Sequence, residues 1–229
     1  MKVATWNIHG AIGRDGRYAP GRIFDVLGEM SADVVALQEV ASLEEHGEFL
    51  GDLRRATGYD VVVGPTMVSR KGGDFGNAIL SRHPITRVER LDLCVDRCEP
   101  RGALDVEIDV GSRRLRVVGT HLGLRPSERR EQVRRLLAAL ESEEPLSTVL
   151  MGDVNEWYLW GRPLRWLHAH FRSTPAPPTF PSLRPVFALD RIWVHPLECL
   201  QRVQPHLSSL ARIASDHLPL TAELELGCA

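Results

Sequence analysis

The sequence has few cysteines and no long apolar run. Its four cysteines are scattered along 229 residues without a CxxC spacing, which argues against a zinc site and against a disulfide-stabilised scaffold. No apolar stretch approaches the ~20 residues that a membrane-spanning helix needs. The first residues also lack the apolar run of a signal peptide. We therefore expect a cytoplasmic protein without a transmembrane segment.

The chain also has little net charge. Its formal net charge is −2 at pH 7, and its positive charge is nearly all arginine, with only Lys2 and Lys71 as lysines. A large nonspecific nucleic-acid footprint is therefore not indicated, although a local basic groove could still bind one. The 43% hydrophobic and 25% charged fractions are those of a globular protein. We expect a single domain over residues 1–229 and assume a monomer.

Short apolar runs alternate with segments of helical period. A hairpin is indicated where residues 106–110 and 113–118 flank Gly111 and Ser112. Because hairpins argue against an all-parallel sheet, we expect an α/β protein with two packed sheets and helices outside. The predicted strands are residues 3–8, 34–37, 78–80, 104–110, 115–121, 148–151, 191–194 and 218–224, and the predicted helices are residues 21–30, 45–57 and 127–140.

The predicted helix at 127–140 has an apolar stripe and an arginine-rich face. Ser127 is predicted to cap its start. We interpret the arginines as a solvated face rather than a binding patch. The stripe consists of Leu136, Leu137 and Leu140, and the arginines are Arg129, Arg130, Arg134 and Arg135. The proline-rich residues 175–185 are predicted to form a surface loop.

Polar residues stand where several apolar strands end. Asn7 ends the first strand, Glu39 follows the second in ALQEV, and His121 follows another in GTHL. Taken alone, each has a plain alternative as a turn or surface residue. A carboxylate at the end of a core strand is nevertheless a candidate ligand for Mg²⁺, which takes oxygen ligands at about 2.0–2.1 Å.

Two further pairs carry acid–base chemistry. Asp153 and Asn155 in GDVNEW project to one side, where they could take a proton from water and hold a phosphate oxygen. Asp190 could orient His217 and stabilise its charged imidazole. Ser215 is not a convincing triad nucleophile, because no GxSxG surrounds it.

Together these motifs resemble the endonuclease/exonuclease/phosphatase superfamily, whose members include base-excision endonucleases, pancreatic-type deoxyribonucleases, neutral sphingomyelinases and inositol phosphatases. The matching pieces run in family order from residue 5 to residue 220: TWNIHG, ALQEV, FGNAILSRHPI, GTHL, GDVNEW, LDRIWV and SDHLPL. The resemblance implies a deoxyribonuclease-I-like fold, a four-layer α/β/β/α sandwich of two mixed sheets.

The resemblance also implies roles for individual residues. Glu39 resembles the main magnesium ligand of the family, with Asn7 and Asp216 nearby, and Mn²⁺ is an alternative ion. The pair Asp153 and Asn155 resembles the one that handles the attacking water and the phosphate. His217, paired with Asp190, resembles the histidine that contacts the scissile phosphate. His121 resembles a second active-site histidine of the deoxyribonuclease and sphingomyelinase branches, which leans away from an abasic-site enzyme.

Several residues are weaker substrate-binding candidates. Asn77, Arg82 and Arg101 could contact a phosphate, and each has a structural alternative as a turn residue or an ion-pair partner. Trp157 begins an aromatic run that ends at Trp166 and could form a substrate wall or the buried face of a short helix. His9 and Asp74 could also support the site, with Asp74 orienting His121.

Three functional hypotheses follow. The first is a magnesium-dependent phosphodiesterase that acts on a lipid-like or small-molecule ester, with either Asp153 or a histidine as the base. The second is a nuclease, which a steep salt dependence of cleavage would favour. The third is a non-catalytic binding module, which is disfavoured because every candidate catalytic residue is present.

Overall fold

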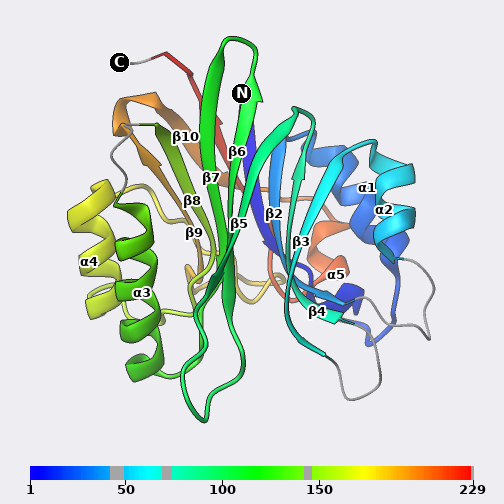
Figure 1. Cartoon of the computed structure of the whole chain (residues 1–229). Coiled ribbons are helices and arrows are strands. Elements are labelled where there is room, and N and C mark those ends of the chain that lie inside the picture. Colours follow the sequence, from blue (N-terminus) through cyan, green and yellow to red (C-terminus); the bar gives the residue numbers. More distant parts are fainter. Residues whose placement is uncertain (42–48, 69–73, 142–145, 228–229) are drawn as a thin grey trace.

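Two β-sheets face each other in the computed structural model, and helices cover their outer faces (Figure 1). The structure describes residues 1–41, 49–68, 74–141 and 146–227. The six-stranded sheet has the order β10 (Leu200–Pro205), β11 (Leu220–Leu224), β1 (Lys2–Asn7), β2 (Val34–Ala41), β4 (Asp74–Ser81), β3 (Asp60–Val68). The five-stranded sheet has the order β5 (Ile85–Asp92), β6 (Gly102–Val110), β7 (Arg113–His121), β8 (Ser147–Asp153), β9 (Asp190–His195).

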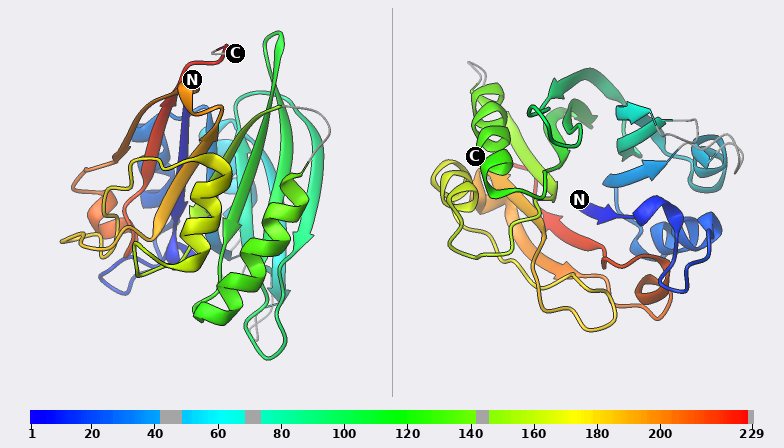
Figure 2. Two further views of the ribbon diagram at one scale, coloured as in Figure 1. Left: turned by 90° about the vertical axis from the view of Figure 1, so that its left-hand side faces the viewer. Right: turned by 90° about the horizontal axis from the view of Figure 1, so that it is seen from below.

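Both sheets are mixed. Strands β1 and β2 are parallel, as are β7 and β8, while β6 and β7 form the expected antiparallel hairpin. Helices α1 (Pro20–Met30), α2 (Phe49–Thr57) and α5 (Ala211–Ala214) pack on the six-stranded sheet. Helices α3 (Pro126–Leu140) and α4 (Arg162–Phe171) pack on the five-stranded sheet. The view from below shows the four layers (Figure 2), which confirms the expected α/β/β/α sandwich.

Period-two alternation explains how one strand serves two cores. In β2, Val34 and Ala36 pack between the sheets, while Val35 and Leu37 point toward the helices. Full burial of one such aliphatic side chain contributes about 1.5–3 kcal/mol to folding. The strands are therefore apolar on both faces, and polar residues concentrate at the strand ends.

Helix α3 corrects two predictions. Pro126 occupies its first turn and the carboxylate of Glu128 accepts a hydrogen bond from the backbone N–H of Arg125 at 3.3 Å, so the helix begins before Ser127 and the predicted serine cap is wrong. Arg129 was predicted on a solvated face, but it is only 1% exposed and forms an ion pair with Glu156 at 3.2 Å.

The edge strands β3, β5 and β10 were not predicted, whereas the edge strand β9 was predicted as residues 191–194. Strand β5 lies at a sheet edge and alternates exposed with half-buried residues, so its sequence lacks an apolar run. The predicted helix at 45–57 is present as α2, while residues 45–48 lie outside the described residues. None of the described helices is long and apolar enough to cross a membrane.

Candidate active site

The polar strand ends of both sheets meet at one edge of the sandwich. In the five-stranded sheet, His121 of β7 and Asp190 of β9 both pair in register with Asp153 of β8. The amide nitrogen of Asn7, at the end of β1, donates to Glu39 Oε1 at 2.9 Å and to Asp153 Oδ2 at 3.1 Å. Asn7 thus joins the carboxylates of the two sheets.

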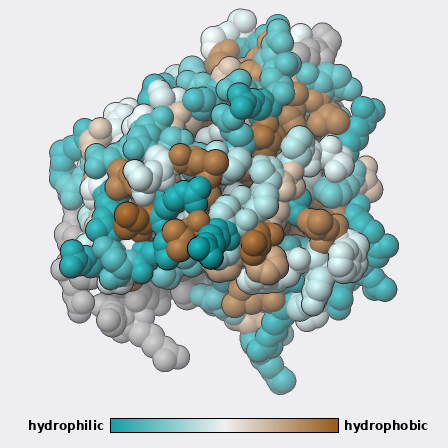
Figure 3. Space-filling view, turned by 180° about the vertical axis from the view of Figure 1, so that it is seen from behind, coloured by the Kyte–Doolittle hydropathy of each residue, from teal (hydrophilic) through white to brown (hydrophobic). Residues whose placement is uncertain are grey.

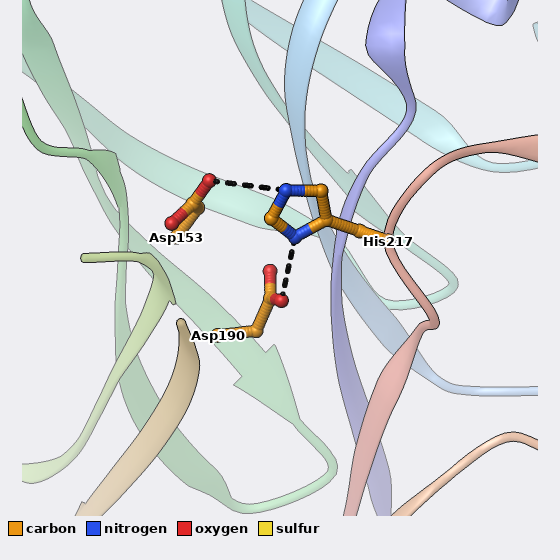
Figure 4. Close-up of side chains that lie close together, drawn as sticks. All are labelled: Asp153, Asp190 and His217. Carbon is orange, nitrogen blue, oxygen red and sulfur yellow. Dashed lines mark hydrogen bonds and ion pairs between the residues drawn. The ribbon is translucent and has the colours of Figure 1, made fainter. Parts of the chain in front are cut away.

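His217 lies between two aspartates (Figure 4). Its Nδ1 is 2.8 Å from Asp190 Oδ2, and its Nε2 is 3.8 Å from Asp153 Oδ2. Because a carboxylate accepts at Nδ1, that nitrogen carries a proton. The hydroxyl of Thr179 donates to the same Asp190 oxygen at 2.6 Å, and the indole N–H of Trp6 donates to the His217 carbonyl at 2.9 Å. These contacts fix the imidazole between the sheets.

The charges of Asp153, Asp190 and His217 shift the pKa values of Asp153 and His217. Burial alone would lower the pKa of His217, but the carboxylates of Asp190 and Asp153 outweigh burial and raise that pKa to about 10. Burial, with the negative charge of Asp190, raises the pKa of Asp153 to about 6, although positively charged His217 opposes the shift. His217 is therefore a cation at neutral pH, and Asp153 is poised to exchange a proton there.

His121 has the opposite environment. Its Nδ1 is 3.1 Å from a guanidinium nitrogen of Arg101, and its Nε2 is 3.1 Å from the amide nitrogen of Asn155, so hydrogen-bond donors face both ring nitrogens. That Nε2 faces Asp153 Oδ2 at 3.5 Å. Burial and the positive charge of Arg101 hold the pKa of His121 well below its usual value. His121 is thus a neutral imidazole beside Asp153.

The backbone is strained at two of the site residues. Glu39 has φ 55° and Asn155 has φ 49°, in the left-handed region that costs a non-glycine residue about 1–2 kcal/mol. Glu39 lies at a β-bulge, where the register shifts between the pairs Leu37–Ala78 and Val40–Gly76. The Asn155 N–H donates to Asp153 Oδ1 at 2.9 Å. The bulge and the turn re-aim their side chains away from the ordinary strand alternation.

Two groups of side chains could hold a divalent cation. Ligand atoms of Asp153, Asp190 and His217 all lie within 4.8 Å of one another. However, a histidine must be neutral to bind a metal, and His217 is held protonated. The oxygen-rich side of the site, where Glu39 and Asp153 approach Asn7, suits a hard cation better. The donor chemistry of the site therefore fits Mg²⁺.

Three other predicted site residues, Asn155, Asp216 and His9, adjoin or contact the residues described above. The Asn155 amide nitrogen donates to the Leu122 carbonyl at 2.9 Å and lies 3.1 Å from His121 Nε2. Asp216 adjoins His217, and its negative charge helps to raise the pKa of that histidine. Within the described part of the chain, no hydrogen bond or ion pair joins Asp216 to Glu39. His9 is exposed, and its N–H donates to Asn7 Oδ1 at 3.1 Å.

Of the substrate-binding candidates, Arg101 and Trp157 lie beside the cluster. Arg101 contacts His121, as described above. The Trp157 ring packs edge-on against Phe180, at 5.9 Å between centroids, and Phe180 lies 4.8 Å from the His217 ring. Trp157 is therefore one aromatic ring away from His217.

Asn77 and Arg82, both predicted from the segment of β4, have structural contacts. The buried Asn77 amide donates to the Gly102 carbonyl of β6 at 2.9 Å and so ties the two sheets together. Arg82 lies at the opposite edge, because Ser81 before it pairs with Val34 at the start of β2. Its guanidinium lies over the Tyr59 ring at 5.3 Å. The structure does not bring Arg82 to the site, and the side chain of Asp74 lies outside the described residues.

Three residues of the site had no predicted role. Thr179 holds Asp190, Phe180 packs against His217, and the Ser215 hydroxyl donates to the Asn7 carbonyl at 2.7 Å. Thr179 and Ser215 are fully buried. The only signal for them was the position of Thr179 and Phe180 in a proline-rich stretch and of Ser215 beside His217.

Comparisons with known proteins agree with this geometry. The chain is 34% identical to YbhP of Escherichia coli K12, an uncharacterised protein, over 99% of this chain and 96% of that one. It superimposes on an endonuclease/exonuclease/phosphatase from Beutenbergia cavernae with TM-score 0.84 and 26% identity, covering 99% of this chain and 72% of that chain. It also superimposes on the mannosyl-6-phosphatase Bt3783 of Bacteroides thetaiotaomicron with TM-score 0.77 and 19% identity, covering 99% of this chain and all of the other.

The model of the Endonuclease/Exonuclease/phosphatase family matches residues 4–217, which span every strand end described above. Members of this family are hydrolases that act on phosphoesters, and they generally use a divalent metal. The resemblance seen in the sequence motifs is confirmed: this chain belongs to the Endonuclease/Exonuclease/phosphatase family.

Proposed function

We propose that this chain is a magnesium-dependent phosphodiesterase that hydrolyses a lipid-like or small-molecule ester, acting as a single-domain monomer. The observation that carries the proposal is the position of His217 between Asp190 and Asp153, with Asn7 joining Asp153 to Glu39. This arrangement places a fixed positive charge beside a carboxylate that can take a proton near neutral pH. Both groups assist the hydrolysis of a phosphate ester, because one takes a proton from water and the other compensates negative charge.

Protonation favours Asp153 over a histidine as the general base. His217 has its pKa raised to about 10 by the flanking aspartates and is already protonated. His121 offers only a weakly basic imidazole, since burial and Arg101 lower its pKa. Asp153, with its pKa raised to about 6, is mostly ionised at pH 7 and is a stronger base than an ordinary carboxylate.

The reaction then follows from the positions of these groups. Asp153 takes a proton from a water molecule whose oxygen attacks phosphorus in line with the leaving oxygen. The P–O bond to the leaving group breaks as the new P–O bond forms, and no covalent enzyme intermediate is needed. His217 donates a hydrogen bond from Nε2 to a phosphate oxygen, and the neighbouring pair His121 and Asn155 contacts the phosphate. His217 also compensates the negative charge that develops.

Glu39, Asn7 and Asp216 are the residues that would hold Mg²⁺, with Mn²⁺ as the alternative ion. When bound, the cation would neutralise charge on the phosphate and act as a Lewis acid. The strained backbone at Glu39 fits this role, because strain at a non-glycine residue concentrates at functional sites.

The surroundings of the site favour a small or lipid-like substrate. Phe180 and Trp157 form an apolar wall beside His217. Such a wall suits the apolar part of an ester. The net charge of −2 provides no general attraction for a long polyanion. Arg101 remains the substrate-binding candidate on the opposite side, next to His121.

The test is magnesium-dependent hydrolysis of a panel of substrates. The panel holds an aryl phosphodiester, an aryl phosphomonoester, glycerophospholipid vesicles and single-stranded and supercoiled DNA. We expect cleavage of the diester or the lipid, lost by at least a hundredfold in Asp153→Ala and His217→Ala, since electrostatic and acid–base groups each contribute roughly 10²–10⁴-fold. Glu39→Gln should raise the Mg²⁺ concentration needed.

His206→Ala is the matched control for His217→Ala, because His206 pairs with Glu29 at the surface at 2.8 Å. It should keep full activity. DNA nicking that disappears in Asp153→Ala would replace this proposal with the nuclease hypothesis. Full activity in His217→Ala would overturn the assignment of the site, and no magnesium-dependent turnover of any substrate would favour a binding module.

A further inference from the structure

Residues 157–189 have a composition unlike the rest of the chain. They include four arginines and no aspartate or glutamate, although the formal net charge of the whole chain is −2. The same segment supplies seven of the eleven exposed large hydrophobic side chains among the described residues: Trp157, Tyr158, Leu159, Trp160, Leu183, Val186 and Phe187. Exposed apolar area and unbalanced positive charge therefore coincide in one stretch.

The fold brings the two ends of this stretch together. The Trp157 ring packs edge-on against Phe187, at 4.9 Å between centroids, and Tyr158 lies 5.7 Å from Trp160. The exposed side chains of residues 157–160 and 183–187 thus form one surface, which we call the 157–187 surface. Seen from behind, hydrophobic residues lie in a broken band across the lower half of the molecule, with hydrophilic residues between them (Figure 3).

Three arginines are available to an external anion: Arg184 within this surface, and Arg162 and Arg165 at the start of α4, which directly follows residues 157–160. Arg162, Arg165 and Arg184 are exposed. Across residues 1–41, 49–68, 74–141 and 146–227, their guanidinium groups have no hydrogen bond or ion pair with the chain. Arg172 differs, because it pairs with Glu198 at 3.3 Å. Large exposed apolar patches mark interaction sites, and here the free cations specify an anionic partner.

We propose that the 157–187 surface docks on an anionic phospholipid bilayer. Tryptophan and tyrosine favour the headgroup level, leucine and valine enter the acyl boundary, and arginine pairs with lipid phosphates. A single-stranded nucleic acid would use the aromatic faces and the arginines. It would leave the exposed aliphatic side chains Leu159, Leu183 and Val186 without a partner. The mixture of aliphatic, aromatic and cationic residues therefore fits a lipid surface better.

Docking in this orientation would place the catalytic cluster at the membrane. Phe180 contacts both Trp157 of the surface and the ring of His217. The surface is thus continuous with the wall of the site, and a docked molecule would meet lipid phosphates beside His217. This catalytic consequence rests on the proposed function, whereas docking itself does not.

The test is co-sedimentation of the full chain with vesicles of phosphatidylglycerol and phosphatidylcholine, and with vesicles of phosphatidylcholine alone. We expect binding to the anionic vesicles that weakens with salt. Leu159→Ser and Trp160→Ser remove side chains that are 65% and 73% exposed, so the fold should persist. Each should weaken binding about fivefold or more, and Arg165→Glu should do the same.

Leu207→Ser is the matched control, because Leu207 is 58% exposed but lies outside the 157–187 surface, next to His206, which pairs with Glu29 of α1. It should bind like the unmodified chain. Three results would overturn the proposal: no binding to anionic vesicles, equal binding by Leu159→Ser, or binding to single-stranded DNA in place of vesicles. Since co-sedimentation needs no turnover, inactivity toward every phosphate ester would contradict the proposed function without affecting this result.

Discussion

At the scale of single residues, the site is defined by how charge is distributed around its two histidines. His217 lies between the carboxylates of Asp190 and Asp153, while His121 faces the guanidinium of Arg101. The same side chain is therefore a cation in one position and neutral in the other. One histidine can compensate phosphate charge, while the other carries no charge.

The protonation of His217 predicts a pH dependence of stability. Its pKa rises from 6.5 in the unfolded chain to about 10 in the folded chain, so the folded state binds the proton more tightly. This stabilisation is complete below pH 6.5 and is lost as the pH rises through about 10. Over that window the free energy of unfolding should fall by up to about 1.4 kcal/mol per pH unit.

Urea unfolding in the presence of EDTA, at pH 6, 8 and 9.5, measures this loss. Tyrosines and lysines also titrate in the alkaline range, so the relevant quantity is the difference from His217→Gln at each pH. That difference should shrink as the pH rises. Parallel stability curves for the two proteins would show that the aspartates do not hold the proton on His217.

The residues of the site could largely be predicted from the sequence, but not all of the contacts between them. The pairing of Asp190 with His217 was predicted correctly, because an aspartate is a common hydrogen-bond partner that orients a histidine. The contact between Arg101 and His121 was not foreseen, since it depends on a loop that folds back between β5 and β6. The predicted role of Arg82 at the site was wrong. The direction of β4, which a motif does not reveal, places Arg82 at the edge of the sheet opposite the site.

At the scale of secondary structure, the close approach of two strand ends determines the spacing of the candidate site residues. Gly152 precedes Asp153 in β8 and pairs in register with Thr120 of β7. A Cβ atom at Gly152 would lie 1.9 Å from the Thr120 carbonyl oxygen. Because that oxygen belongs to the backbone, a side chain could be accommodated only if β7 and β8 separate. Glycine here therefore sets the distance between His121 and Asp153.

Gly152→Ala should consequently impair both stability and catalysis. We expect a loss of stability of several kcal/mol, within the range of severe core overpacking, and a loss of activity of more than tenfold in the protein that stays folded. Thermal unfolding and kcat/KM toward the preferred ester of the panel provide the two measurements.

Gly28→Ala in α1 is the matched control, since nothing lies within 4 Å of a Cβ atom there. It should be neutral or stabilising by about 0.5–1 kcal/mol, because alanine is the better helix former. If Gly152→Ala kept full activity, the strand ends would have more freedom than the register of β7 and β8 implies.

The burial of each strand explains whether it could be predicted from the sequence. The apolar strands β1, β2 and β8 are buried on both faces, so their sequences carry a strong signal. Strands β5 and β10 lie at sheet edges and have only half-buried or exposed residues, so their signal is weak. The buried Arg129 was misassigned because its partner Glu156 is distant in sequence and no local pattern reports it.

At the scale of the whole molecule, the candidate active site also connects the two sheets. Asn7 and Glu39 come from the six-stranded sheet, whereas Asp153 and Asp190 come from the five-stranded sheet. The proposed metal ligands Asn7 and Glu39 belong to the six-stranded sheet, and the Asn7 amide also donates across to Asp153 of the five-stranded sheet. Metal binding is therefore expected to stabilise the domain as one cooperative unit.

Mg²⁺ should raise the melting temperature of the full chain in a single transition. A ligand at a hundred times its Kd adds about 2.7 kcal/mol, which corresponds to a rise of roughly 5–10 °C for a domain of this size. Glu39→Gln should lose most of that rise, whereas Glu29→Gln, at a surface carboxylate paired with His206, should keep it. Differential scanning calorimetry with and without Mg²⁺ measures the effect. An equal rise in Glu39→Gln would mean that the cation binds elsewhere, and two separate transitions would mean that the sheets do not unfold as one body.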